Sequence, residues 1–187
     1  MAQSSTVKKQ HWTLEEWLAT ELEPRYEFEN GRLVRMASPT RRHQRIVGKL
    51  FGQLDNWMSW TGLGFVEMEI DVALPTGVGY IPDLVFVRYE RESELYTPDG
   101  KIRGVPDLVV EVISPGTRRR DTVHKLRAYQ EAGVPWYWLV DSETLVMQEF
   151  RLTPTGYRIE TVADAGEVFR PAALPGFEMN LQELLED

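Results

Sequence analysis

The sequence predicts one mixed α/β (α+β) domain in which helices flank a central sheet. Two observations lead to this class. Apolar residues recur at helical spacing in two long segments, 39–59 and 117–132. Short segments with strand patterns precede, separate and follow these helices. The 187 residues, 42% of them hydrophobic, also suffice for a single domain with a substantial core.

The first part of the chain predicts a helix, a hairpin and a long helix. Thr13-Leu14-Glu15-Glu16 is a capping-box pattern, so we expect a helix over 14–22. Asn30-Gly31 lies between two short strand-like segments and predicts a two-residue hairpin. Ser38-Pro39 has the residue types of an N-cap and a first helical position, and it begins the helix expected over 39–59.

Strands and a loop are expected next. Residues 65–74 alternate between apolar and acidic positions, as a half-buried strand does. Residues 83–88 and 107–113 are almost continuously apolar, which is typical of strands covered on both faces. The charged segment 89–104 contains Pro98-Asp99-Gly100 and predicts a surface loop with at most one helical turn.

A helix and several strands complete the domain. A tight turn at 114–117 leads into the helix over 117–132, and Gly133 is its expected C-cap. Further strands are expected over 136–140, 145–152 and 157–162, followed by a short helix from about 180. We assign the whole chain, 1–187, to one domain with a flexible tail at 1–11, a core at 12–150 and a C-terminal extension at 151–187.

The composition argues against several classes of protein. The chain has no cysteine, which excludes a disulfide framework, a thiolate metal site and a cysteine nucleophile, and fits a reducing cytoplasm. No apolar stretch approaches the ~18 residues needed to span a membrane. The N-terminus lacks the hydrophobic segment of a signal peptide, so we expect a cytoplasmic protein. The net charge of −8 argues against broad, nonspecific binding to a polyanion.

Two acids on neighbouring hydrophobic strands point to a metal site. Glu111 interrupts the apolar run 107–113, where an unpaired carboxylate costs several kcal/mol. Asp83 begins the apolar run that follows Pro82. Carboxylates are the ligands that Mg²⁺ prefers, and Mn²⁺ is an alternative ion. The competing readings are structural: Glu111 pairs with a nearby arginine such as Arg118, and Asp83 only starts a strand.

A metal-dependent phosphodiesterase also needs a cation close to the carboxylates. The metal polarises the phosphate and acidifies water, while a lysine positions that water or offsets developing charge. Ile113 stands where such a strand would carry the lysine. Lys125 lies on the next helix, on the same stripe as Tyr129, and a lysine there can extend toward the strand. The alternative is a solvent-facing helix pair between Lys125 and Asp121.

These motifs together resemble a bacterial family of candidate restriction endonucleases in the PD-(D/E)XK nuclease superfamily. The resemblance covers roughly residues 12–150, and its most specific block is 106–141. It implies a restriction-endonuclease-like core and a Mg²⁺ site formed by Asp83 and Glu111. It also implies that the catalytic lysine is displaced from the strand onto the following helix, as Lys125.

The resemblance brings two further residues to the edge of this site, Glu27 and His43. Glu27 faces Val34 across the predicted hairpin, which indicates an inward side chain. His43 shares a helix face with apolar residues, so its alternative role is that of a packing residue. Basic residues near these elements are the candidates for DNA contact, and their alternative is a solvated surface: Arg42, Arg45, Arg118, Arg119 and Arg120.

The function expected from the sequence is therefore Mg²⁺-dependent hydrolysis of phosphodiester bonds in DNA. The alternative is a catalytically inactive protein of the same fold that binds nucleic acid or serves in assembly, and Ile113 and the net charge of −8 favour it. Nucleases of this superfamily often dimerise, so a homodimer or higher homo-oligomer is a further expectation. Trp136 and Trp138 are read as core or interface residues, with base stacking as a lesser alternative.

Overall fold

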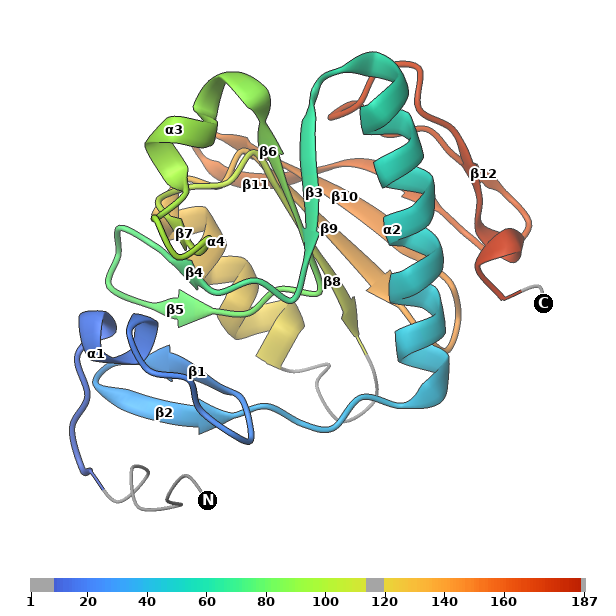
Figure 1. Ribbon diagram of the computed structural model, residues 1–187. Coiled ribbons are helices and arrows are strands. Elements are labelled where there is room, and N and C mark those ends of the chain that lie inside the picture. The colour runs from blue at the N-terminus through green and yellow to red at the C-terminus, as the bar shows by residue number, and fades with distance from the viewer. Residues whose placement is uncertain (1–8, 114–119, 186–187) are drawn as a thin grey trace.

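A computed structural model describes residues 9–113 and 120–185, and its centre is a six-stranded mixed sheet (Figure 1). Strands β8 and β9 run parallel, and every other neighbouring pair is antiparallel. This arrangement confirms the mixed α/β class. In spatial order the strands are β11 (Gly156–Ala163), β10 (Met147–Thr153), β9 (Trp136–Asp141), β8 (Leu108–Ile113), β6 (Leu84–Arg88) and β3 (Gly64–Met68).

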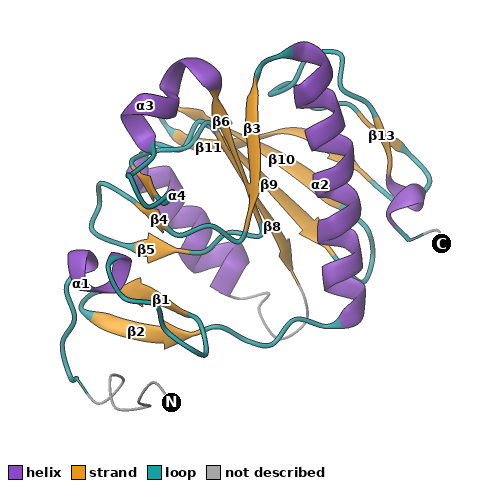
Figure 2. Ribbon diagram, viewed as in Figure 1, coloured by secondary structure: helices purple, strands orange, loops and turns teal. Residues whose placement is uncertain are grey.

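The central sheet is covered on both faces (Figure 2). Even-numbered residues of β6 and β8, such as Leu84 and Val110, pack with the long helix α2 (Arg41–Thr61). Odd-numbered residues, such as Val85 and Val109, pack with the helix α4 (Leu126–Ala132). Because alternate side chains of a strand point to opposite faces, every residue of β8 is buried, and Glu111 is buried with them.

A second sheet joins the N-terminal hairpin to the body. Asn30 and Gly31 both have positive φ, 49° and 80°, as the hairpin prediction requires, and Glu27 lies opposite Val34. The predicted capping box is present at Thr13, but α1 (Leu14–Leu18) is shorter than expected. The order of this sheet is β2 (Arg32–Arg35), β1 (Tyr26–Glu29), β5 (Gly79–Tyr80), β4 (Val72–Ala73) and β7 (Ile102–Arg103).

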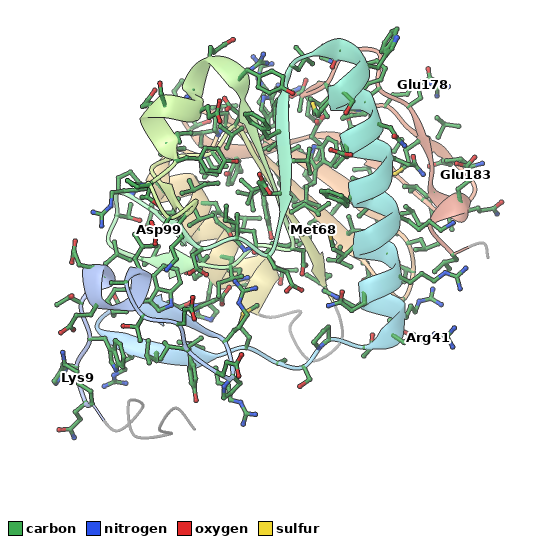
Figure 3. The ribbon with its side chains drawn as sticks, viewed as in Figure 1. Lys9, Arg41, Met68, Asp99, Glu178 and Glu183 are labelled. Atoms are coloured by element: carbon green, nitrogen blue, oxygen red, sulfur yellow. The ribbon has the colours of Figure 1, made fainter. Side chains whose placement is uncertain are left out.

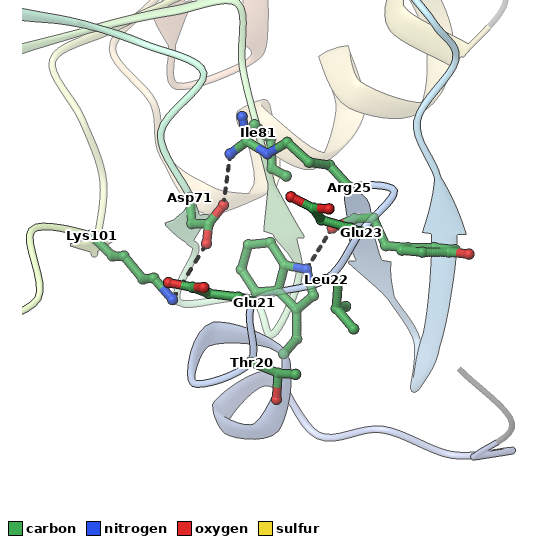
Figure 4. Close-up of a pocket in the computed structure, with 10 residues that line it drawn as sticks. Thr20, Glu21, Leu22, Glu23, Arg25, Asp71, Ile81 and Lys101 are labelled. Carbon is green, nitrogen blue, oxygen red and sulfur yellow. Dashed lines mark hydrogen bonds and ion pairs between the residues drawn. The ribbon is translucent and has the colours of Figure 1, made fainter. Parts of the chain in front are cut away.

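Polar contacts around a pocket anchor the hairpin to the rest of this second sheet (Figure 4). Arg25 donates to the Glu69 carbonyl at 2.6 Å and to Asp71 at 3.1 Å. Lys101 pairs with the same aspartate at 3.5 Å and also donates to the Leu18 carbonyl. These bonds tie the segment before β1 to the chain before β4, so the position of β1 and its side chains is set by the body of the protein.

Two predicted boundaries differ from the structure. Helix α2 begins at Arg41, after Thr40, because the Thr40 hydroxyl accepts the His43 N–H at 3.1 Å and so acts as the N-cap in place of Ser38. The strand predicted over 65–74 is interrupted. Glu69 has φ +48°, and there the chain leaves the central sheet and passes to β4 in the second sheet.

The segments predicted as loop and as helices also differ in detail. The loop 89–104 holds a 3₁₀ turn, the short helix α3 (Glu92–Leu95) and β7. Of the predicted helix 117–132, residues 117–119 lie outside the described part. The rest is a π-helical turn (Arg120–Lys125) followed by α4, with Gly133 at φ +88° as the predicted C-cap. The expected helix near 180 is a 3₁₀ turn, Leu181–Leu184.

The C-terminal extension packs on the same core as α2. The predicted boundary at 150 cuts through the central sheet, because β11 lies within 151–187. The extension also contains β12 (Val168–Phe169) and β13 (Met179–Asn180), and Phe169 and Leu181 are fully buried beside the central sheet. Charged side chains such as Arg41 and Glu183 project outward around this core (Figure 3). Within the described residues, no helix combines the length and apolar character needed to cross a membrane.

Candidate active site

A buried lysine joins two glutamates from different sheets. Lys125 ends the π-helical turn that precedes α4, and its Nζ lies 2.7 Å from Glu111 Oε1 and 2.9 Å from Glu27 Oε1. All three side chains are at most 5% exposed. The lysine therefore extends from the helix to the strand, as its position on the inward stripe predicts, and the described structure places Glu27 against the same ammonium.

Two tyrosines surround this ion pair. The Tyr129 hydroxyl donates to Glu111 Oε1 at 2.7 Å, the same oxygen that Lys125 contacts. The Lys125 ammonium also lies 5.5 Å from the centre of the Tyr80 ring, within the range of a cation–π contact. Burial and then the nearby Glu111 and Glu27 charges raise the pKa of Tyr129 well above its ordinary value, so its hydroxyl remains a hydrogen-bond donor.

Asp83 lies at the same end of the central sheet as Glu111. Leu84 of β6 pairs with Val110 of β8 in antiparallel register, and continuing that register by one residue sets Asp83 opposite Glu111. The Val112 N–H donates to Asp83 Oδ2 at 2.7 Å and fixes the carboxylate beside β8. The two acids predicted to hold a metal thus come together from neighbouring strands.

His43 approaches Asp83 from the other face of the sheet. Its Nε2 lies 3.3 Å from Asp83 Oδ1, and its place in the first turn of α2 follows from the Thr40 cap. Burial by itself lowers the pKa of His43, but the hydrogen bond and charge of Asp83, with the Val112 backbone, outweigh burial and raise it. His43 is therefore a polar partner of Asp83 as well as a residue of the packed helix.

The short segment from Ile81 to Asp83 links the two halves of the site. The Ile81 N–H donates to Glu27 Oε1 at 3.2 Å, and two residues later Asp83 faces Val112. Glu27 therefore receives a backbone donor and the Lys125 ammonium on one oxygen. This segment fixes the distance between the hairpin carboxylate and the carboxylates of the central sheet.

The donor set suits a hard divalent cation that keeps much of its water. Three buried carboxylates, from Glu27, Asp83 and Glu111, lie around one ammonium and one histidine, which gives the site an acidic character. Mg²⁺ is commonly held by one or two carboxylates with water in its other positions. In the described part of the chain, no three or more histidine, cysteine, aspartate or glutamate side chains form a group that could hold a metal ion, so a cation at this site would depend on two carboxylates and water.

The candidate DNA-binding arginines are placed less uniformly. Arg42 donates to the backbone carbonyls of Ser142 and Glu143, the latter at 3.2 Å, so it connects α2 to the turn between β9 and β10. Arg45 is half-buried on α2. Arg118 and Arg119 lie outside the described residues, and Arg120 begins the π-helical turn.

Other sequence readings are resolved by the fold. Asp107, just before β8, accepts the Arg88 backbone N–H and an Arg91 side-chain N–H, both at 3.0 Å, so its contacts are structural and lie at the end of the strand opposite Glu111. Trp138 is fully buried in a strand paired on both sides, which makes it a core residue and removes it from the candidate interface. The possible partner of Lys125, Asp121, has its side chain outside the described part.

Sequence reasoning missed the roles of Tyr80, Tyr129 and the Ile81 backbone. Tyr129 lies four residues after Lys125, on the same inward helix stripe. An aromatic residue on a packed helix face is ordinarily a core residue, so the pattern did not indicate a role in the site. Tyr80 and Ile81 join the site through pairing of segments distant in sequence, and no local pattern marks them.

Comparison with known proteins supports the fold and the family. A "putative nuclease belonging to DUF820" from Anabaena variabilis has a crystal structure that matches with a TM-score of 0.75 at 18% identity. The match covers 92% of this chain and 97% of that one, so the two share a fold. No curated protein matches the chain. The family model of Uma2, described as "Putative restriction endonuclease", matches residues 13–182, and the chain therefore belongs to this restriction-endonuclease-like family of the PD-(D/E)XK superfamily.

Proposed function

We propose that the protein is a Mg²⁺-dependent endonuclease that hydrolyses phosphodiester bonds of DNA. The observation that carries the proposal is the buried contact between Lys125 and Glu111 at 2.7 Å, next to Asp83. A lysine brought from a helix to a strand carboxylate supplies the cation that Ile113 cannot supply from the strand itself. Family membership supports the same chemistry.

In this proposal Asp83 and Glu111 hold Mg²⁺, or Mn²⁺ in its place. The ion, when bound, supplies a Lewis acid that polarises the phosphate and acidifies a coordinated water. Lys125 positions the attacking water and offsets charge that develops on the phosphate. Glu27 shares the ammonium with Glu111 and so holds Lys125 at the site, and His43 orients Asp83 through its hydrogen bond.

The substrate surface would lie beside the end of β8 that carries Glu111. The segment that follows β8 in sequence contains Arg118, Arg119 and Arg120, which we assign to contacts with the DNA backbone. Arg42 and Arg45 on α2 complete the proposed basic surface. The net charge of −8 means that such contacts are local. Binding should weaken as salt rises, because each arginine–phosphate contact releases counterions.

Cleavage of supercoiled plasmid in Mg²⁺ tests the proposal. The native protein should cut, while Glu111→Ala and Lys125→Ala should both lose activity. Asp107→Asn is the matched control, because this acid flanks the same strand at the end opposite Glu111 and accepts from the Arg88 backbone and the Arg91 side chain. It should retain the activity of folded native protein. Equal trace activity in the native protein and in Glu111→Ala would identify a contaminant and reject the proposal.

The rival function is that of an inactive relative that binds nucleic acid or serves in assembly. Ile113 in place of a strand lysine favours it. This rival predicts that Lys125→Ala changes stability alone and that no metal restores cleavage. Gel-shift titration at low salt then distinguishes the nucleic-acid-binding protein from the assembly protein. The assembly protein should have negligible DNA affinity even at low salt, where electrostatic attraction is strongest.

A further inference from the structure

The Tyr129 hydroxyl lies in the candidate active site, and the mechanism above gives it no role. Its side chain is fully buried, and the ring is held between Tyr80 and Tyr137, with ring centres 5.5 and 5.3 Å away. Packing accounts for the ring. The hydroxyl, however, donates to Glu111 Oε1 at 2.7 Å, which packing does not require.

Tyr129 and Lys125 act on the same carboxylate oxygen. They lie four residues apart, so they project from one face of the helical segment, and both donate to Glu111 Oε1 at 2.7 Å. Two donors on one oxygen fix the rotation of a carboxylate about its last bond. Fixing one oxygen also sets the direction of the other, which is the geometry a metal ligand needs.

We propose that Tyr129 is a positioning residue that orients the Glu111 carboxylate toward its cation. The inference rests on the proposed metal site and deepens it. With the hydroxyl absent, Glu111 Oε1 loses one of its donors. The Lys125 ammonium that still contacts it belongs to a flexible side chain, so the orientation of the carboxylate relaxes.

Tyr129→Phe tests the inference, and Tyr157→Phe is its matched control. Phenylalanine retains the ring that contacts Tyr80 and Tyr137. The Tyr157 hydroxyl also makes a hydrogen bond within the fold, donating to the Val134 carbonyl at 2.8 Å, and Val134 is not a residue of the candidate site. Each variant therefore loses one hydrogen bond of a tyrosine hydroxyl, and only the first loses it from the Glu111 carboxylate.

Calorimetric titration with Mn²⁺ in the absence of DNA is the first measurement. Tyr129→Phe should bind Mn²⁺ about tenfold more weakly than the native protein, as for other groups that orient metal ligands. Tyr157→Phe should bind as the native protein does. In plasmid cleavage, Tyr129→Phe should lower kcat and leave the KM for DNA unchanged, because the hydroxyl does not contact the substrate.

The outcomes separate this inference from the proposed function. Weaker Mn²⁺ binding by Tyr129→Phe in a protein that does not cleave DNA supports the inference and rejects the endonuclease. Cleavage by the native protein with equal Mn²⁺ affinity and kcat in Tyr129→Phe overturns the inference alone. Absence of Mn²⁺ binding by the native protein overturns both. Failure of Tyr129→Phe to fold also overturns the inference, since the hydroxyl would then serve stability.

Discussion

Replacing Lys125 by methionine should destabilise the protein strongly. Lys125 and its two glutamate partners are at most 5% exposed, so solvent screens their charges very little. Removing one partner of a buried ion pair typically costs about 3–5 kcal/mol, because the remaining charges lose their counter-ion. For a domain of this size such a loss lowers Tm by roughly 6–20 °C. Methionine is chosen because it keeps most of the volume of the lysine stem.

Urea unfolding monitored by tryptophan fluorescence measures the effect. The double variant Glu27→Gln with Lys125→Met should be less destabilised than the sum of the two single variants, with a coupling energy of at least about 1 kcal/mol. The reason is that removing Glu27 also removes one of the two charges that Lys125 contacts. A loss below about 1 kcal/mol in Lys125→Met would refute the reasoning, since surface ion pairs contribute that little.

Three further substitutions test the fold that holds the site. Glu149→Gln should lower the free energy of unfolding in urea by about 2 kcal/mol, because the buried carboxylate accepts from Trp138 Nε1 at 3.0 Å. Cleavage by the folded variant should not change, and an unchanged unfolding midpoint would contradict the prediction. Gly79→Ala should cost about 1–3 kcal/mol and alter the near-ultraviolet spectrum, because its Cβ would lie 2.4 Å from the Trp17 ring; native stability would disprove the clash. Arg42→Ala should cost about 1 kcal/mol through its lost carbonyl bonds, and a pure DNA contact would instead leave stability unchanged.

The elements that the sequence predicted well are those with local causes. The Asn30-Gly31 hairpin, the Thr13 capping box and the Gly133 C-cap each follow from a few neighbouring residues, and the structure has all three. The approach of Lys125 to Glu111 was also predictable, because Lys125 shares the inward helix stripe with Tyr129 and the strand that carries Glu111 precedes it directly in sequence. In each case, tertiary contacts reinforce the local preference.

The features that sequence reasoning missed depend on contacts between distant segments. The break at Glu69 accompanies an Arg25 side chain that binds its carbonyl from 44 residues away, which no alternation pattern reveals. Ser38 and Thr40 both have N-cap residue types, and serine is the more favourable of the two, so residue type alone does not identify Thr40 as the cap of α2. The sequence alone predicts that Tyr129 is a core residue. Its hydrogen bond to Glu111 becomes visible only when the strand that carries Glu111 is packed against the helix.

The dependence of unfolding free energy on Mg²⁺ tests the central claim, a metal site made by Asp83 and Glu111, most directly. A ligand present at 100 times its Kd stabilises the native state by about 2.7 kcal/mol. Urea unfolding with and without Mg²⁺ should show a gain of this kind for the native protein and for Asp107→Asn. The gain should disappear in Asp83→Asn and in Glu111→Gln. An equal gain in all four proteins, or none in the native protein, would contradict the assignment of these two acids to a metal.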